Sequence, residues 1–122
     1  MDKRRSLSRG ECLELLRSRS AGRVALTANA LPHITPVRYY VVGETIFLDT
    51  STFDVGDNIV GNVIALECGI DDIAGSGTLW SVCAVGVPVP SNDIPVTEPI
   101  LRLHPELIRG WMQSALAPHT GQ

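Results

Sequence analysis

The stretch HITPVRYYVVGETIFLD, residues 33–49, decides the fold of this protein. Residues 33–42 and 45–49 are predicted to be strands, and Val42-Gly43-Glu44 reverses the chain between them. The proline at position 36 has no backbone N–H, so it must lie at a sheet edge or a bulge, where no ladder donor is needed. The stretch therefore predicts two antiparallel strands joined by a tight turn.

A helix and another strand are predicted before this stretch. The segment SRGE, residues 8–11, has the form of a capping box, and apolar residues follow at helical spacing from Cys12 to Leu16. That helix should end near residues 19–22. From Arg23 to Ala28 the pattern changes to a period of two, which is typical of a strand, and Asn29-Ala30 suits a turn. We expect a helix followed by a meander of three antiparallel strands.

The second half of the chain is predicted to add further strands. Residues 63–71 and 78–89 alternate between two faces, and residues 56–62 suit a single helical turn. After a proline-rich loop at 91–99, we expect a short strand or turn and then a terminal helix over 105–115. Five or six short strands with few helices indicate a small β-barrel, and 122 residues suffice for one domain.

Charge and composition narrow the class of partner. The net charge of −3 hides a basic first segment, because residues 1–38 hold eight of the ten Lys and Arg against three acids. This segment lacks interleaved aromatic residues and any recognition motif, so we expect a flexible, solvated arm over residues 1–7 rather than nucleic-acid binding. The tail at 117–122 is expected to be flexible as well.

Membrane insertion, export and metal binding are not predicted. No apolar run reaches the roughly 18 residues that a membrane span requires, and no apolar segment follows the charged start MDKRRSLSRGE. We therefore expect a cytoplasmic protein. Three cysteines without a close pair argue against a disulfide framework or a zinc site, and the three histidines have no metal-ligand spacing.

The order of the predicted segments resembles the pyridoxamine 5'-phosphate oxidase-like family of flavin-binding split barrels. Order and spacing, rather than any single motif, make the match from residue 8 to about residue 88, and LRLHPELIRGW is similar to the family's closing segment. The resemblance implies a mainly β protein, a six-stranded antiparallel split barrel with short flanking helices and the N-terminal helix first, as one domain over 1–122. It also implies a homodimer, with FMN or a deazaflavin in a groove between the subunits. The segments that carry this resemblance are, in chain order, GRVAL, PVRYYVV, IFLDTS, VIALECGID and LWSVCAVG.

The same resemblance implies a site for the cofactor phosphate directly after residues 45–49. Thr50 and Ser51 match hydroxyl residues that face the phosphate in the family. However, Asp49 stands where the family has an arginine, and Val55 and Val85 stand where it has a lysine and a second arginine. Charge-assisted contacts of this kind contribute about 1.5 to 3 kcal/mol each. If a cofactor binds, other groups must therefore supply the phosphate contacts of the three missing cations.

Two arginines are candidates for that replacement. Arg23 opens one predicted strand and Arg38 lies in the next, so together they could hold a dianion with their planar guanidinium groups. The alternative is that both arginines pair with acids such as Glu67 or Asp49 on the barrel surface.

The resemblance places the flavin ring near a second group of residues. The backbone at Pro36 and Val37 and the side chain of Trp80, in the pair Trp80-Ser81, would flank the ring. The alternatives need no ligand: Pro36 can be an edge-strand proline, and Trp80 can lie in the core or at a subunit contact.

These observations support more than one function. The first hypothesis is an FMN-binding oxidoreductase that acts on a small substrate as a homodimer; no catalytic residue is identified. The alternative is a family member that has lost the cofactor and serves as a small-ligand-binding or dimeric accessory protein, which the three missing cations favour. A tetrapyrrole binder is a third hypothesis, with only His33 or His104 available as an axial ligand.

Overall fold

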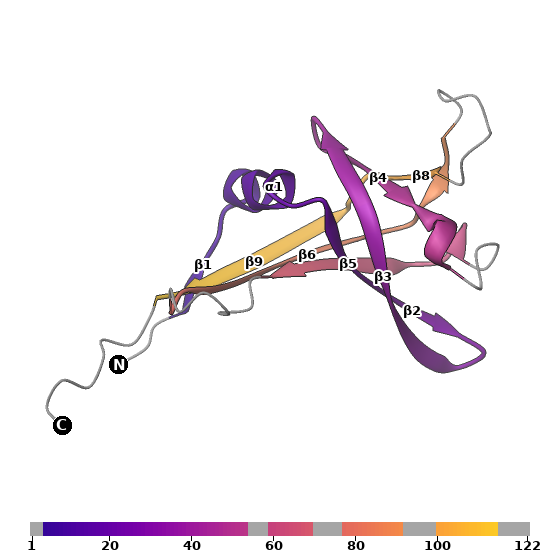
Figure 1. Cartoon of the computed structure of the whole chain (residues 1–122), viewed down its shortest axis with the longest axis horizontal. Coiled ribbons are helices and arrows are strands. Elements are labelled where there is room, and N and C mark those ends of the chain that lie inside the picture. Colours follow the sequence, from indigo (N-terminus) through magenta and orange to yellow (C-terminus); the bar gives the residue numbers. More distant parts are fainter. Residues whose placement is uncertain (1–3, 54–58, 70–76, 92–99, 115–122) are drawn as a thin grey trace, which may run out of the picture.

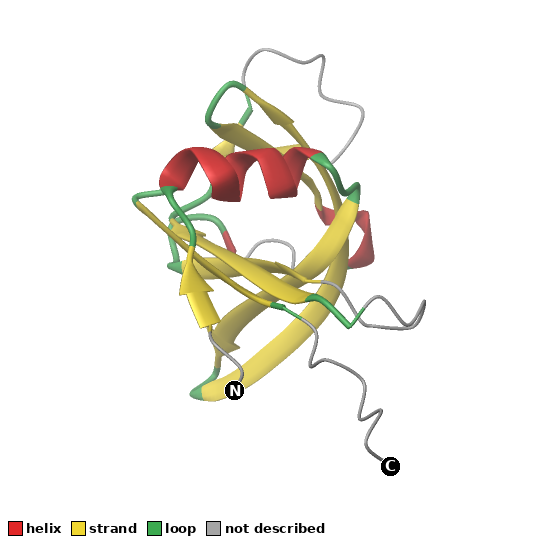
Figure 2. Ribbon diagram, turned by 90° about the vertical axis from the view of Figure 1, so that its left-hand side faces the viewer, coloured by secondary structure: helices red, strands yellow, loops and turns green. Residues whose placement is uncertain are grey.

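The computed structural model describes residues 4–53, 59–69, 77–91 and 100–114. Within these ranges, nine strands form one antiparallel sheet in the order β1-β9-β6-β5-β2-β3-β4-β8-β7. The sheet curls around its core, and α1 lies across it (Figures 1 and 2). The edge strands β1 and β7 have no pairing with each other in the described part of the chain, so the fold is a split β-barrel. The elements are β1 (Arg4–Ser6), α1 (Arg9–Arg17), β2 (Ala21–Ala28), β3 (Leu31–Val42), β4 (Thr45–Asp49), the 3-10 helix η1 (Thr50–Thr52), β5 (Ile64–Gly69), β6 (Leu79–Gly86), β7 (Val89–Pro90), β8 (Ile100–Leu103) and β9 (Leu107–Gln113).

The predicted helix and three-stranded meander are confirmed. Ser8 Oγ accepts a hydrogen bond from the backbone N–H of Glu11 at 3.2 Å, and the Glu11 carboxylate accepts one from the N–H of Ser8 at 3.0 Å. Strands β2, β3 and β4 follow in order and pair as antiparallel neighbours. Gly43 has φ 61°, which explains the glycine in the tight turn between β3 and β4.

The predicted terminal helix over 105–115 is wrong, because Leu107–Gln113 forms strand β9. This strand pairs with β6 on one side and with β1 on the other. Ile108 and Met112 both pack against the core. Their spacing of four residues puts them on one face of a strand as well as on one face of a helix. The tertiary pairing with β6 decides between the two structures.

The expected order and number of elements also need correction. The helix is not the first element, because Arg4–Ser6 of the predicted arm forms strand β1. This strand pairs with β9 at the edge of the sheet, and the local sequence pattern does not reveal that pairing. The short strand expected before residue 105 is β8, and β1, β7 and β9 raise the count from six to nine in the described ranges. The predicted tail at 117–122, residues 56–58 of the predicted turn and residues 92–99 of the predicted loop lie outside the described residues.

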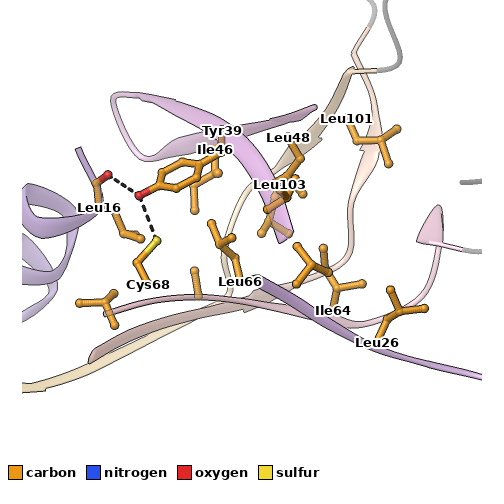
Figure 3. Packing of buried hydrophobic residues seen from close by; sticks show 14 of the residues in the cluster. Leu16, Leu26, Tyr39, Ile46, Leu48, Ile64, Leu66, Cys68, Leu101 and Leu103 are labelled. Atoms are coloured by element: carbon orange, nitrogen blue, oxygen red, sulfur yellow. Dashed lines mark hydrogen bonds between the residues drawn. The ribbon is translucent and has the colours of Figure 1, made fainter. Parts of the chain in front are cut away.

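One apolar core fills the barrel. Side chains that alternate along the strands point inward, as the period of two predicts. Leu48 of β4, Leu66 of β5 and Leu103 of β8 are fully buried and lie close together in Figure 3. The opposite side chains of these strands face outward and form the outer surface of the barrel.

Tyr39 of β3 links α1 to the barrel. Its hydroxyl donates a hydrogen bond to the backbone oxygen of Leu16 at 2.6 Å and accepts one from Cys68 Sγ at 3.1 Å (Figure 3). Burial, and then the Cys68 hydrogen bond, raise the pKa of Tyr39 well above its usual range. A Cβ at Gly110 of β9 would lie 2.7 Å from Cys12 Sγ, so glycine permits the close approach of α1. The helix is therefore held in a defined place on the barrel.

The turn between β2 and β3 offers a first test of the structure. Both Asn29 and Ala30 have positive φ, at 53° and 61°, and this is the geometry that favours Asn-Gly. We expect Ala30→Gly to raise the free energy of unfolding by about 0.5 to 1 kcal/mol, because relief of the left-handed strain outweighs the added freedom of the unfolded chain. Urea denaturation measures it. Thr27→Gly in the adjoining strand should instead destabilise, and equal effects of the two changes would contradict the turn geometry.

Candidate functional site

An apolar row crosses the outer face of the barrel. Its five members are directly opposite one another in register on five neighbouring strands. The row ends are accessible, with Ile34 exposed to 70% and Leu107 to 40%. Such a row on a sheet exterior is a candidate surface for association. Its members, from β3 to β9, are Ile34, Ala25, Ala65, Val85 and Leu107.

A second row runs beside the apolar row, two residues away from it on each strand. We call it the polar row, because it contains Arg23 and Glu67. Arg23 of β2 lies opposite Glu67 of β5, and Arg23 Nε is 3.5 Å from Glu67 Oε1. Ser81 of β6 donates a hydrogen bond to the other carboxylate oxygen at 3.0 Å. Glu67 is thus held between a guanidinium group and a hydroxyl. Arg23 and Glu67 both line two grooves of about 260 and 310 Å³.

A larger groove of about 620 Å³ lies over β3 and β4. Arg38 and Tyr40 project from β3, opposite Asp49 and Phe47 of β4 respectively. The Tyr40 and Phe47 rings are stacked, with centroids 4.9 Å apart and an interplanar angle of 11°. This groove and the 260 Å³ groove share Ala21, so the two are contiguous on the outer face.

The hydroxyl turn after β4 is tied up by its own side chains. Asp49 accepts a hydrogen bond from the backbone N–H of Ser51 at 2.9 Å, and Thr52 Oγ1 donates to the backbone oxygen of Pro36 at 2.8 Å. The hydrogen bonds from Ser51, followed by the nearby Arg38 charge, lower the pKa of Asp49. Asp49 is therefore ionised at neutral pH. It occupies a backbone amide that a phosphate would otherwise use.

The sequence predicts Pro36 at a sheet edge or a bulge, but β3 is not an edge strand, because β2 and β4 flank it. The register explains how proline is accommodated. The Pro36 carbonyl points away from β2 toward Thr52. Because the carbonyl and the nitrogen of one strand residue face the same side, the Pro36 nitrogen also points away from β2. The pairing of β4 with β3 stops at Arg38, so no β4 acceptor is left without a donor. Proline fits here without loss of a ladder hydrogen bond.

The structure brings only part of the predicted site together. Arg23, Pro36, Arg38 and Ser81 project from the outer face, and Ser51 is exposed beyond β4. Arg23 and Arg38 lie on neighbouring strands, two register positions apart. The side chains of three other predicted residues are buried and do not reach that face. These three are Val37, Thr50 and Trp80.

Trp80 and the cysteines belong to the interior. Trp80 is part of the core cluster, and the Arg19 guanidinium lies 5.7 Å from its ring centroid, which agrees with the core alternative for this residue. Burial raises the pKa of both Cys68 and Cys83. Thiols in this state are poor nucleophiles at neutral pH. Within the described ranges, no group of three or more His, Cys, Asp or Glu residues could hold a metal ion, and no helix is long and apolar enough to cross a membrane.

Comparison with known proteins identifies the family. The model of the pyridoxamine 5'-phosphate oxidase family matches residues 8–119. The chain belongs to this family. The resemblance of its segment order is therefore confirmed, although no curated protein matches the chain.

Several solved structures of family-like folds are similar to this family member. The FAD binding protein from Mycobacterium smegmatis is 27% identical, with a TM-score of 0.77 over 90% of this chain and 98% of that chain. A FAD-binding protein from Mesorhizobium loti has 15% identity and a TM-score of 0.75 over 93% and 99% of the two chains. The FAD and heme binding protein from Mycobacterium smegmatis has 12% identity and a TM-score of 0.63 over 92% and 74%. The last two support the fold alone.

Sequence reasoning missed the aromatic pair of this pyridoxamine 5'-phosphate oxidase family member. It assigned no cofactor role to Tyr40 or Phe47, although the turn at Gly43 places them opposite each other once the two strands are in register. It also missed that Asp49 caps η1. An aspartate two residues before a backbone N–H in a turn is a local signal for such a cap, so this contact could have been found. The expected lysine position, Val55, lies outside the described residues.

Proposed function

We propose that this protein binds a flavin nucleotide on the outer face of its barrel and transfers electrons to or from a small substrate. The observation that carries the proposal is the position of Arg23 and Arg38, which project from the same face of β2 and β3, two register positions apart, into two grooves that share Ala21. Two guanidinium groups at this spacing suit a phosphate or pyrophosphate. A bound flavin supplies the redox chemistry, while the protein supplies position and charge.

The choice of flavin depends on the local charge. Each arginine faces an acid, since Arg23 contacts Glu67 and Arg38 lies opposite Asp49. FMN ends in a phosphate monoester whose binding relies on cations, and this face offers few that are unopposed. FAD carries a second half that can bind through uncharged contacts. We therefore propose FAD rather than the FMN expected from the family resemblance, and the name of the 27% identical FAD binding protein from Mycobacterium smegmatis supports this choice.

We also propose that the protein is a homodimer. The apolar row defined above gives its outer face a self-complementary surface, and a second copy that packs on this row would enclose the neighbouring polar row and its grooves. A groove closed in this way excludes water from a flavin ring. This arrangement gives both rows a role in the same site.

The second candidate function is cofactor-free binding of a small molecule. The contact between Arg23 and Glu67 and the Asp49 cap on η1 favour it, because these groups satisfy one another without a ligand. In that case the grooves would take an uncharged or cationic molecule rather than a phosphate.

A titration with flavins tests the two functions. The purified protein should show a flavin absorption spectrum or quench added FAD, FMN or deazaflavin with micromolar affinity. We expect Arg38→Ala to raise the Kd for FAD roughly tenfold or more, through loss of a charge-assisted contact. The matched control is Arg9→Ala, since Arg9 pairs with Glu44 at 2.8 Å by the helix. Unchanged FAD affinity in Arg38→Ala would remove Arg38 from the site, and a protein that ignores every flavin would support the cofactor-free function.

A further inference from the structure

The stacked pair of Tyr40 and Phe47 lies at one end of the contiguous grooves. Tyr40 is exposed to 46%, which is high for a large aromatic side chain that already stacks on another ring. Neither ring belongs to the core cluster. An accessible aromatic platform beside a groove of about 620 Å³ is suited to a planar, uncharged ring system.

The charged groups beside this platform discriminate between parts of a ligand. Asp49 accepts hydrogen bonds from the backbone and the side chain of Ser51, and the lone pairs that remain on its carboxylate can accept from a ligand amine. A carboxylate repels a phosphate but suits the exocyclic amine of a base. Arg38 lies on β3, the strand that also carries Tyr40, and its position along the strand is between the platform and Arg23 of β2. The groove therefore places groups that suit a base next to groups that suit a phosphate on the same face of the sheet.

The order of the strands also sets how far the charged groups extend across the outer face. Four neighbouring strands, β5, β2, β3 and β4, carry Glu67, Arg23, Arg38 and Asp49 respectively. Three strand spacings of about 4.8 Å separate the outermost two of these groups across the sheet. The aromatic pair lies two residues beyond Arg38 and Asp49 along the same two strands, so the platform continues this line of charged groups.

We infer that the groove beside Tyr40 and Phe47 is a subsite for the adenosine half of a dinucleotide. The base stacks on the Tyr40 ring, Asp49 accepts from its amine, and Arg38 binds the pyrophosphate. This inference rests on the flavin binding proposed above. It gives the aspartate at position 49 a positive role, where the family resemblance leads one to expect an arginine for a phosphate.

The test compares FAD with FMN on matched variants by fluorescence titration. Wild-type protein should bind FAD at least about tenfold more tightly than FMN, because stacking of a base on an aromatic ring contributes a factor of this order. Tyr40→Ala should raise the Kd for FAD about tenfold and leave the Kd for FMN unchanged. Tyr40→Phe keeps the ring and should restore FAD affinity. Val42→Ala, at an exposed position on the same face of β3, is the control for general effects on the strand.

The outcomes separate this inference from the function on which it rests. A selective loss of FAD affinity in Tyr40→Ala supports the adenosine subsite. Flavin binding without preference for FAD, or equal losses for FAD and FMN, overturns the subsite and leaves flavin binding in place. Absence of any flavin binding in the wild-type protein overturns both. Circular dichroism of each variant establishes that it is folded.

Discussion

If the protein forms the homodimer proposed above, an Ile34→Asp variant is expected to be monomeric at concentrations where the wild-type protein associates. Ile34 ends the apolar row and is exposed to 70%. A carboxylate placed in this row would be buried without a partner when two copies associate, and this cost is several kcal/mol. The dimer dissociation constant should therefore rise at least about a hundredfold. Sedimentation velocity over a range of concentrations measures the change.

The matched control for that variant is Leu31→Asp. Leu31 lies on the same strand and is exposed to 62%, but it is outside the apolar row, near the end of the β2–β3 hairpin that projects from the barrel (Figure 1). It should leave the oligomeric state unchanged. If Ile34→Asp stays dimeric, or if both variants dissociate equally, the apolar row is not the contact between subunits.

Leu66→Ala is expected to produce the largest loss of stability. Leu66 is fully buried at the centre of β5, opposite Val24 of β2 and Ala84 of β6. Removal of its side chain leaves a cavity that the neighbouring strands cannot fill, at a cost of about 2 to 5 kcal/mol. The total stability of a domain is only about 5 to 15 kcal/mol. Urea denaturation should therefore show a midpoint far below that of the wild-type protein.

Val63→Ala provides the comparison for Leu66→Ala. Val63 directly precedes β5 and is exposed to 64%, so its truncation should change the free energy of unfolding by no more than about 0.5 kcal/mol. The two substitutions both shorten an apolar side chain within four residues of sequence. Similar losses in both variants would mean that β5 does not lie at the centre of the core.

The candidate site was predictable only in part. Arg23 and Arg38 could be named because the chain has no Lys or Arg between residues 39 and 101, and the acids that could oppose them, Glu67 and Asp49, could be named as well. The sequence left open whether Trp80 covers a ligand or lies in the core, and the structure places its side chain in the core. One step of register moves every side chain of a strand to the other face, so the facing of a residue depends on partners that local patterns do not specify.

Local patterns by themselves determined the capped helix, the strands β2 to β4 with their turns, and the order of segments that marks the family. The helix and the turns depend on residues only a few positions apart, such as Ser8 with Glu11 or Asn29 with Ala30, and the family match depends on the order of such local segments. Only the tertiary structure decided that residues 107–113 form a strand and that two rows, one apolar and one polar, cross the outer face. The physical reason is that pairing between distant strands fixes their register, and register decides which side chains meet.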